Sequence, residues 1–189
     1  MDTFWRTLLW KQFGAAIDTL DNALVACSDA LWHESVWENP RGRVEFWYVA
    51  YHTLFWLDLY LSGYEEGFAP RAPFGLEELD PDGKLPERPF TRDELRAYLA
   101  YTRQKLRATV EALTDERARQ PVDFGWMREG ESVSYYELQL YNMRHAQEHA
   151  AQLSLLLGRH GVPDEALDWV TRARDDLATP DRTTGERGL

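Results

Sequence analysis

The sequence predicts an all-α protein, a bundle of four long helices joined by long connections, and three observations support this prediction. Apolar residues recur at helical spacing in four separate segments of the chain. No segment shows the apolar–polar alternation that is typical of a half-buried strand. Two of the four segments follow a capping box, Thr91-x-x-Glu94 and Ser134-x-x-Glu137, which marks the N-terminus of a helix.

The first two helices are predicted from apolar spacing and from the breaks that follow them. Residues 3–30 carry Phe, Leu and Ile side chains at roughly helical spacing. The segment ENPRGR, with Pro40 and Gly42, then interrupts the helix. Residues 44–61 are apolar nearly all round, as expected of a helix that is buried on several sides. Gly63 follows this helix and would readily form a left-handed C-cap.

A long connection, two further long helices and a short C-terminal helix complete the predicted fold. The Tyr64–Phe90 connection contains five prolines. A connection of this length is more often functional than idle, so it is either a lid or a crossover strap between bundle helices. The third helix is expected over residues 91–113 and the fourth over 134–158. A short helix is expected after Pro163, with Trp169 anchoring it to the bundle.

The composition predicts one soluble domain over residues 1–174, followed by a polar, flexible tail over 175–189. The net charge of −11 disfavours binding to nucleic acid or to an anionic membrane surface. Cys27 is the only cysteine, so no internal disulfide forms, and a buried, inert thiol is favoured over a catalytic one. The start of the chain lacks a signal-peptide pattern and no apolar run is long enough to span a bilayer, so we expect a cytoplasmic protein.

Three histidines stand in strongly apolar helical segments and form the candidate functional site. His145 and His149 are four residues apart, so they share one helix face, and apolar neighbours indicate that this face points inward. His52 lies in the middle of the second predicted helix, and facing helices of a bundle pack about 8–10 Å apart. Three imidazoles plus water leave an open coordination position, as in catalytic metal sites. Ordinary core packing with hydrogen bonds is the alternative.

Polar residues close to these histidines are candidates for supporting roles. Asn142, Glu148 and Gln152 are positioned to hydrogen-bond the second nitrogen of a ligand histidine and fix its tautomer. Glu148 and Tyr48 are also the candidate catalytic groups, Glu148 as a general base and Tyr48 through its hydroxyl. The alternatives are a solvated charge for Glu148 and a core tyrosine for Tyr48.

The spacing excludes two well-known kinds of helical metal site. A zincin helix needs His-Glu-x-x-His, whereas here the glutamate directly precedes the second histidine in the segment His145–His149. Di-iron carboxylate bundles need Glu-x-x-His pairs, and none of the three histidines has a glutamate three positions before it. The two remaining histidines, His33 and His160, are expected at the surface.

His52 in an aromatic helix, the pair His145-x-x-x-His149 and the nearby Gln152 together resemble the DinB-like (DinB/YfiT) superfamily of metalloenzymes. The resemblance covers residues 1 to about 174 and includes the order of four long helices and a short C-terminal element. It implies a four-helix bundle with up-down-down-up connectivity. It also implies a divalent metal held by the three histidines, with water completing the coordination sphere. Homodimers are common in the family, and the family name does not imply DNA binding.

The leading functional hypothesis is a metal-dependent enzyme that acts on a small molecule. The metal, Zn first with Ni, Fe or Mn as alternatives, would lower the pKa of a bound water or of a thiol. Because some relatives are thiol-dependent transferases, an S-transferase that uses a low-molecular-weight thiol is favoured over a metal-dependent hydrolase. A non-catalytic, stress-related metal-binding module is the competing hypothesis. The Tyr64–Phe90 connection is expected to help form the substrate pocket.

Overall fold

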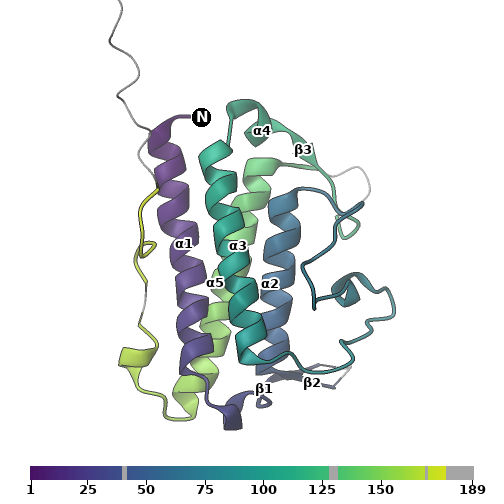
Figure 1. The fold of residues 1–189 in the computed structure, drawn as a ribbon, viewed down its shortest axis with the longest axis vertical. Coiled ribbons are helices and arrows are strands. Elements are labelled where there is room, and N and C mark those ends of the chain that lie inside the picture. Colours follow the sequence, from purple (N-terminus) through teal and green to yellow (C-terminus); the bar gives the residue numbers. More distant parts are fainter. Residues whose placement is uncertain (40–41, 128–131, 169, 178–189) are drawn as a thin grey trace, which may run out of the picture.

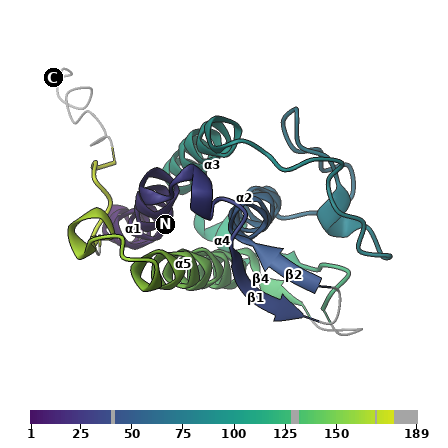
Figure 2. The ribbon, with the colours of Figure 1, turned by 90° about the horizontal axis from the view of Figure 1, so that it is seen from below.

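The computed structural model shows an all-α bundle, as predicted, and describes residues 1–39, 42–127, 132–168 and 170–177 (Figure 1). Seen end-on, the four long helices surround one core (Figure 2). A short helix, α4, links the third long helix to the fourth. The helices are α1 (Thr3–Ala26), α2 (Phe46–Ser62), α3 (Arg92–Ala112), α4 (Asp115–Arg119) and α5 (Tyr135–Arg159).

The direction of each helix follows from contacts between helix ends. Arg6 near the start of α1 donates to the carbonyl oxygen of Glu111 near the end of α3, so these helices are antiparallel. Tyr135 at the start of α5 donates to the carbonyl oxygen of Leu61 near the end of α2, so these two are antiparallel as well. α2 and α3 run in the same direction (Figure 1). The up-down-down-up connectivity is therefore confirmed.

The ends of the helices are set by local sequence. Both predicted capping boxes are present, with Thr91 and Ser134 accepting from the backbone of the glutamate three residues on. Gly63 takes the left-handed conformation at the end of α2, with φ of 78°. The first helix is shorter than predicted, because the backbone of Cys27 is extended and a separate 3₁₀ turn, Asp29–Leu31, carries the remaining apolar spacing.

The sequence shows no strand alternation, but the structure contains two short antiparallel pairs of strands. β1 (Ser35–Asn39) and β2 (Gly42–Glu45) form an antiparallel hairpin across the segment that the sequence marked only as a break. A second small pair joins β3 (Pro121–Val122) to β4 (Val133–Ser134). Both pairs are too short for a periodic pattern to reveal them. The hairpin lies beside α2 and α5 at one end of the bundle (Figure 2).

The connection between α2 and α3 is fastened to the bundle by its aromatic residues. Phe68, Phe74 and Phe90 are all buried. Phe74 stacks on Tyr98 of α3 with ring centroids 4.2 Å apart. These aromatic contacts anchor the connection to α2 and α3, and between the anchors it carries a 3₁₀ turn, Glu77–Leu79.

The short C-terminal helix expected after Pro163 is a single 3₁₀ turn, Asp164–Ala166. Trp169, its predicted anchor, lies outside the described residues, as do residues 178–189 of the predicted tail. The described segment 170–177 packs along α1 and α3, where Asp175 pairs with Arg107 at 2.6 Å. Within the described part of the chain, no helix combines the length and the apolar character that crossing a bilayer requires.

Side chains from two other helices, α4 and α5, satisfy the last backbone carbonyls of α2. The final carbonyls of a helix have no partner within it. Here Gln139 of α5 donates to the carbonyl oxygen of Tyr60 at 2.8 Å, Tyr135 to that of Leu61 at 2.7 Å, and Arg117 of α4 to that of Ser62 at 3.1 Å. These bonds fix the position of α2 along α5.

We therefore predict that Tyr135→Phe destabilises the protein by about 1–3 kcal/mol, because the buried Leu61 carbonyl loses its donor while the ring remains. Urea unfolding monitored by circular dichroism measures the loss. Tyr136→Phe, at the next position, is the matched control and should leave the stability unchanged. Equal stability of the two variants would show that the Tyr135 bond contributes nothing.

Candidate metal centre

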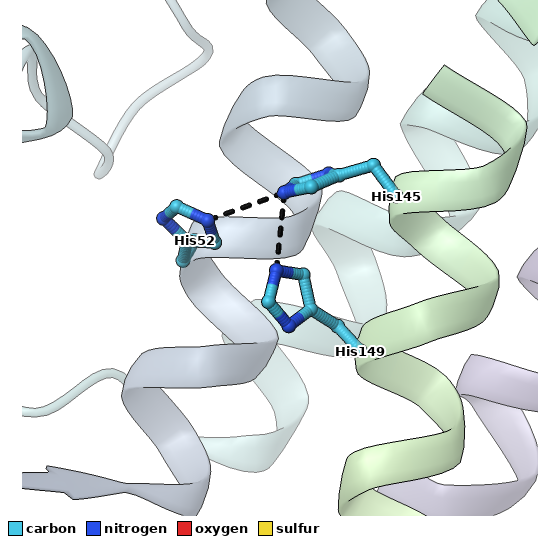
Figure 3. A group of neighbouring side chains, drawn as sticks. All are labelled: His52, His145 and His149. Atoms are coloured by element: carbon cyan, nitrogen blue, oxygen red, sulfur yellow. Dashed lines mark hydrogen bonds between the residues drawn. The ribbon is translucent and has the colours of Figure 1, made fainter. Parts of the chain in front are cut away.

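The three predicted histidines lie next to one another between α2 and α5 (Figure 3). The Nε2 atom of His145 is 3.3 Å from Nε2 of His52 and 3.1 Å from Nε2 of His149. Ligand nitrogens about 2.1 Å from one ion lie roughly 3.0–3.4 Å apart in octahedral or tetrahedral coordination. The three side chains therefore form a group that can hold one metal ion.

Two of the three imidazoles are oriented by acceptors on their other nitrogen. Nδ1 of His52 is 2.6 Å from Oε2 of Glu78, and Nδ1 of His149 is 2.7 Å from Oε1 of Gln152. A proton on each Nδ1 donates to these oxygens, so the lone pair of each Nε2 points toward the other ring nitrogens. Hydrogen bonds among the three histidines cannot satisfy both of these lone pairs. A neutral His145 carries at most one proton on Nε2, and it can donate that proton to only one of the two other Nε2 atoms.

Burial keeps the histidines of α5 neutral. Burial, reinforced by the charges of His52 and His149, lowers the pKa of His145 to about 3. Burial and the charge of His52 also lower the pKa of His149, although the Gln152 hydrogen bond acts in the opposite direction. A neutral imidazole keeps a lone pair for a metal ion at neutral pH. Nδ1 of His145 is buried and has no hydrogen-bond partner among the described residues.

Glu78 belongs to this site and was not predicted from the sequence. It comes from the 3₁₀ turn Glu77–Leu79, and its Oε2 also accepts from Nε1 of Trp56 at 2.9 Å. Burial alone would raise the pKa of Glu78, but hydrogen bonds from His52, Tyr48 and Trp56 hold it below its usual value. The only feature of the sequence that pointed to this region was the length of the Tyr64–Phe90 connection, which contains Glu78.

Of the three residues predicted to hydrogen-bond a ligand histidine, Asn142, Glu148 and Gln152, only Gln152 does so among the described residues. Gln152 contacts His149 directly, whereas Glu148 accepts a 3.5 Å bond from Gln152. Asn142 donates to the Leu57 carbonyl and to Gln139. The ring of Tyr48 is centred 6.4 Å from that of His52, and the hydroxyl bonds to Glu78.

The remaining candidates lie outside the cluster. His33 is exposed and pairs with Glu45 at 2.8 Å, and His160 is an exposed residue that caps α5. Cys27 is buried, which raises the pKa of its thiol to about 12. A thiol with so high a pKa carries almost no thiolate at neutral pH, so it is poorly suited to nucleophilic chemistry.

A cavity of about 680 Å³ opens beside His52. Its walls come from α2, the hairpin and the connection between α2 and α3. Trp37 of β1 both lines the cavity and stacks on His149, with ring centroids 6.2 Å apart. The aromatic lining consists of Trp37, Trp47, Tyr48 and Trp56, and the charged lining of Arg43, Lys84, Glu45, Glu77, Glu78 and Asp80.

A family model described as the DinB superfamily matches residues 12–153, a span that includes all three histidines. The chain belongs to the DinB superfamily. The comparison with curated proteins gives no match. The comparison with solved structures gives none either. Membership of the DinB superfamily and the three-histidine cluster are together compatible with a metal-binding enzyme.

The convergence of three Nε2 atoms predicts that replacing one of these buried histidines by an apolar residue stabilises the metal-free protein. In metal-free protein, His145→Leu should increase the free energy of unfolding by about 1 kcal/mol, because it removes a buried polar group without a partner on Nδ1. Urea unfolding in the presence of a chelator measures this. His160→Leu, at the exposed position, should change nothing. A clear loss of stability in His145→Leu would instead support histidines that are packed and hydrogen-bonded to one another.

Proposed function

We propose that this member of the DinB superfamily is a metal-dependent enzyme that acts on a small molecule, with His52, His145 and His149 as the ligands of one divalent ion. The observation that carries the proposal is the convergence of three Nε2 atoms at 3.1 and 3.3 Å, two of them aimed by acceptors on Nδ1. Three protein ligands leave coordination positions for other molecules.

The donor set fits a divalent transition metal. Neutral imidazoles suit Zn, Ni and Fe, and Mn is a further alternative. We propose Zn as the ion. When bound, such an ion supplies Lewis acidity and lowers the pKa of a water or thiol that it binds.

The protein's own residues position the ligands and shape the substrate pocket. Glu78 and Gln152 hold the rings of His52 and His149, which limits the reorganisation needed on binding. The tryptophans of the cavity offer flat apolar faces, since Nε1 of Trp47 and of Trp56 already donate to glutamates. We propose that these faces hold the apolar part of the substrate and exclude water around it.

Within this class we favour an S-transferase that uses a low-molecular-weight thiol, and a metal-dependent hydrolase is the second candidate. The aromatic walls suit the apolar part of an organic acceptor. The acidic net charge disfavours nucleic acid as a substrate. A homodimer and a cytoplasmic location complete the proposal.

A non-catalytic metal-binding module is the competing proposal. It retains the same ligands, but the metal would only stabilise the bundle. The cavity beside His52 favours an enzyme over this reading, because a purely structural ion needs no pocket at its side.

We predict that untagged protein binds one divalent ion per chain and that a concentration of 100 times Kd stabilises it by about 2.7 kcal/mol. Elemental analysis and thermal unfolding measure these values. The double variant His145→Ala/His149→Ala should lose the ion and the stabilisation. The double variant His33→Ala/His160→Ala should keep both. Retention of the ion by the first variant would overturn the proposed ligand set.

We further predict that metal-loaded protein transfers a small thiol to an electrophilic acceptor, and that His145→Ala/His149→Ala does not. Mass spectrometry of the adducts formed with a panel of thiols and acceptors measures this. Ester cleavage that needs no thiol would favour the hydrolase. Metal-dependent stability without turnover of either panel would favour the non-catalytic module.

A further inference from the structure

Glu78 gathers hydrogen-bond donors from one face of α2. His52 and Trp56 are four residues apart, so they lie one turn apart on this face, and both approach Oε2 of Glu78, at 2.6 and 2.9 Å. Tyr48, one turn before His52, also bonds to this carboxylate. Three donors from successive turns therefore meet a single acceptor that lies outside the bundle helices.

The contact is buried and well defined. The Glu78 side chain is 5% exposed, whereas that of His52 is 30% exposed on the side of the cavity. A buried carboxylate needs donors, and Oε2 has them, whereas Oε1 is buried without a partner among the described residues. Glu77, the preceding residue, turns to a different partner and accepts from the hydroxyl of Tyr51 at 3.2 Å. The two neighbouring glutamates therefore fasten the turn to α2, but only Glu78 contacts a histidine.

We propose that Glu78 is a positioning residue of the metal centre, which keeps the proton of His52 on Nδ1 and couples metal binding to the order of the cavity wall. The inference rests on the proposed function, because it assumes that His52 is a ligand. Without an acceptor at Nδ1, the ring of His52 is free to rotate and to carry its proton on Nε2, the atom that must face the ion.

Metal binding and the order of the cavity wall are coupled because the turn Glu77–Leu79 takes part in both. Glu78 belongs both to the hydrogen bond with His52 and to the lining of the cavity. An ion that fixes His52 also fixes the partner of Nδ1, and therefore stabilises the turn. By linkage, an ordered turn increases the affinity for the ion by the same factor.

The first test compares the Zn²⁺ affinities of three variants by competition with a chromophoric chelator. Glu78→Ala should bind about 10–100 times more weakly than the unmodified protein. Glu78→Gln should lose less, because an amide oxygen still accepts from Nδ1. Glu77→Gln is the matched control: its amide oxygen still accepts from the Tyr51 hydroxyl, so the turn stays fastened and the variant should bind as the unmodified protein does.

Two further measurements separate positioning from a general loosening of the fold. Nitrogen-detected NMR of metal-free protein at mildly alkaline pH should find the His52 proton on Nδ1, and should find it partly on Nε2 in Glu78→Ala. Hydrogen exchange should show that Zn²⁺ protects the amides of Leu79 and Asp80, which donate within the turn at 2.9 and 3.1 Å. This protection should disappear in Glu78→Ala.

The outcomes distinguish this inference from the proposed function. Absence of Zn²⁺ binding by the unmodified protein would overturn both. Normal binding by Glu78→Ala would overturn the role of Glu78 alone, and so would equal losses in Glu78→Ala and Glu77→Gln. If Glu78→Ala fails to fold, the affinity of Glu78→Gln, its His52 tautomer and its exchange pattern decide the question instead.

Discussion

The antiparallel contact between α2 and α5 is the constraint on which the rest of the structure depends. Donors of α5 reach carbonyls of α2 at Tyr60 and Leu61, and each of these carbonyls would otherwise be buried without a partner. These bonds cannot slip by a turn without losing their partners, so they fix how far α2 lies along α5. Two turns further on, the same alignment brings His52 opposite His145 and His149.

The site places polar atoms where a bundle would otherwise place apolar side chains, and this has an energetic consequence. An unpaired polar atom inside a protein costs roughly 1–3 kcal/mol. Nδ1 of His145 lacks a partner among the described residues, and the three Nε2 atoms converge although His145 can offer a proton to only one of the other two. Such an arrangement would destabilise the metal-free fold, whereas one bound cation would accept a lone pair from each of the three imidazoles. The arrangement is therefore typical of function rather than of stability.

The features that could be predicted from the sequence are those that depend on residues close together in the chain. Helical spacing and the capping boxes at Thr91 and Ser134 predicted the bundle, and spacing four residues apart put His145 and His149 on one face. Glu78 could not be found in this way, because it is 26 residues from His52 in sequence and no periodic pattern connects the two. The hairpin was missed for a related reason, since strands of four and five residues show too little alternation.

The two sides of the centre are held by elements of different kinds, and this difference bears on its chemistry. On α5, His149 is held by Gln152 within the same helix, and Trp37 of the hairpin stacks on its ring. On α2, His52 is held by Glu78, whose turn depends on the packing of a long connection and also borders the cavity. The cavity therefore borders the residue that orients His52, Glu78, and also Trp37, which stacks on His149. The orientation of His52 therefore depends on residues far apart in the sequence, whereas the hydrogen bond that orients His149 forms within a single helix.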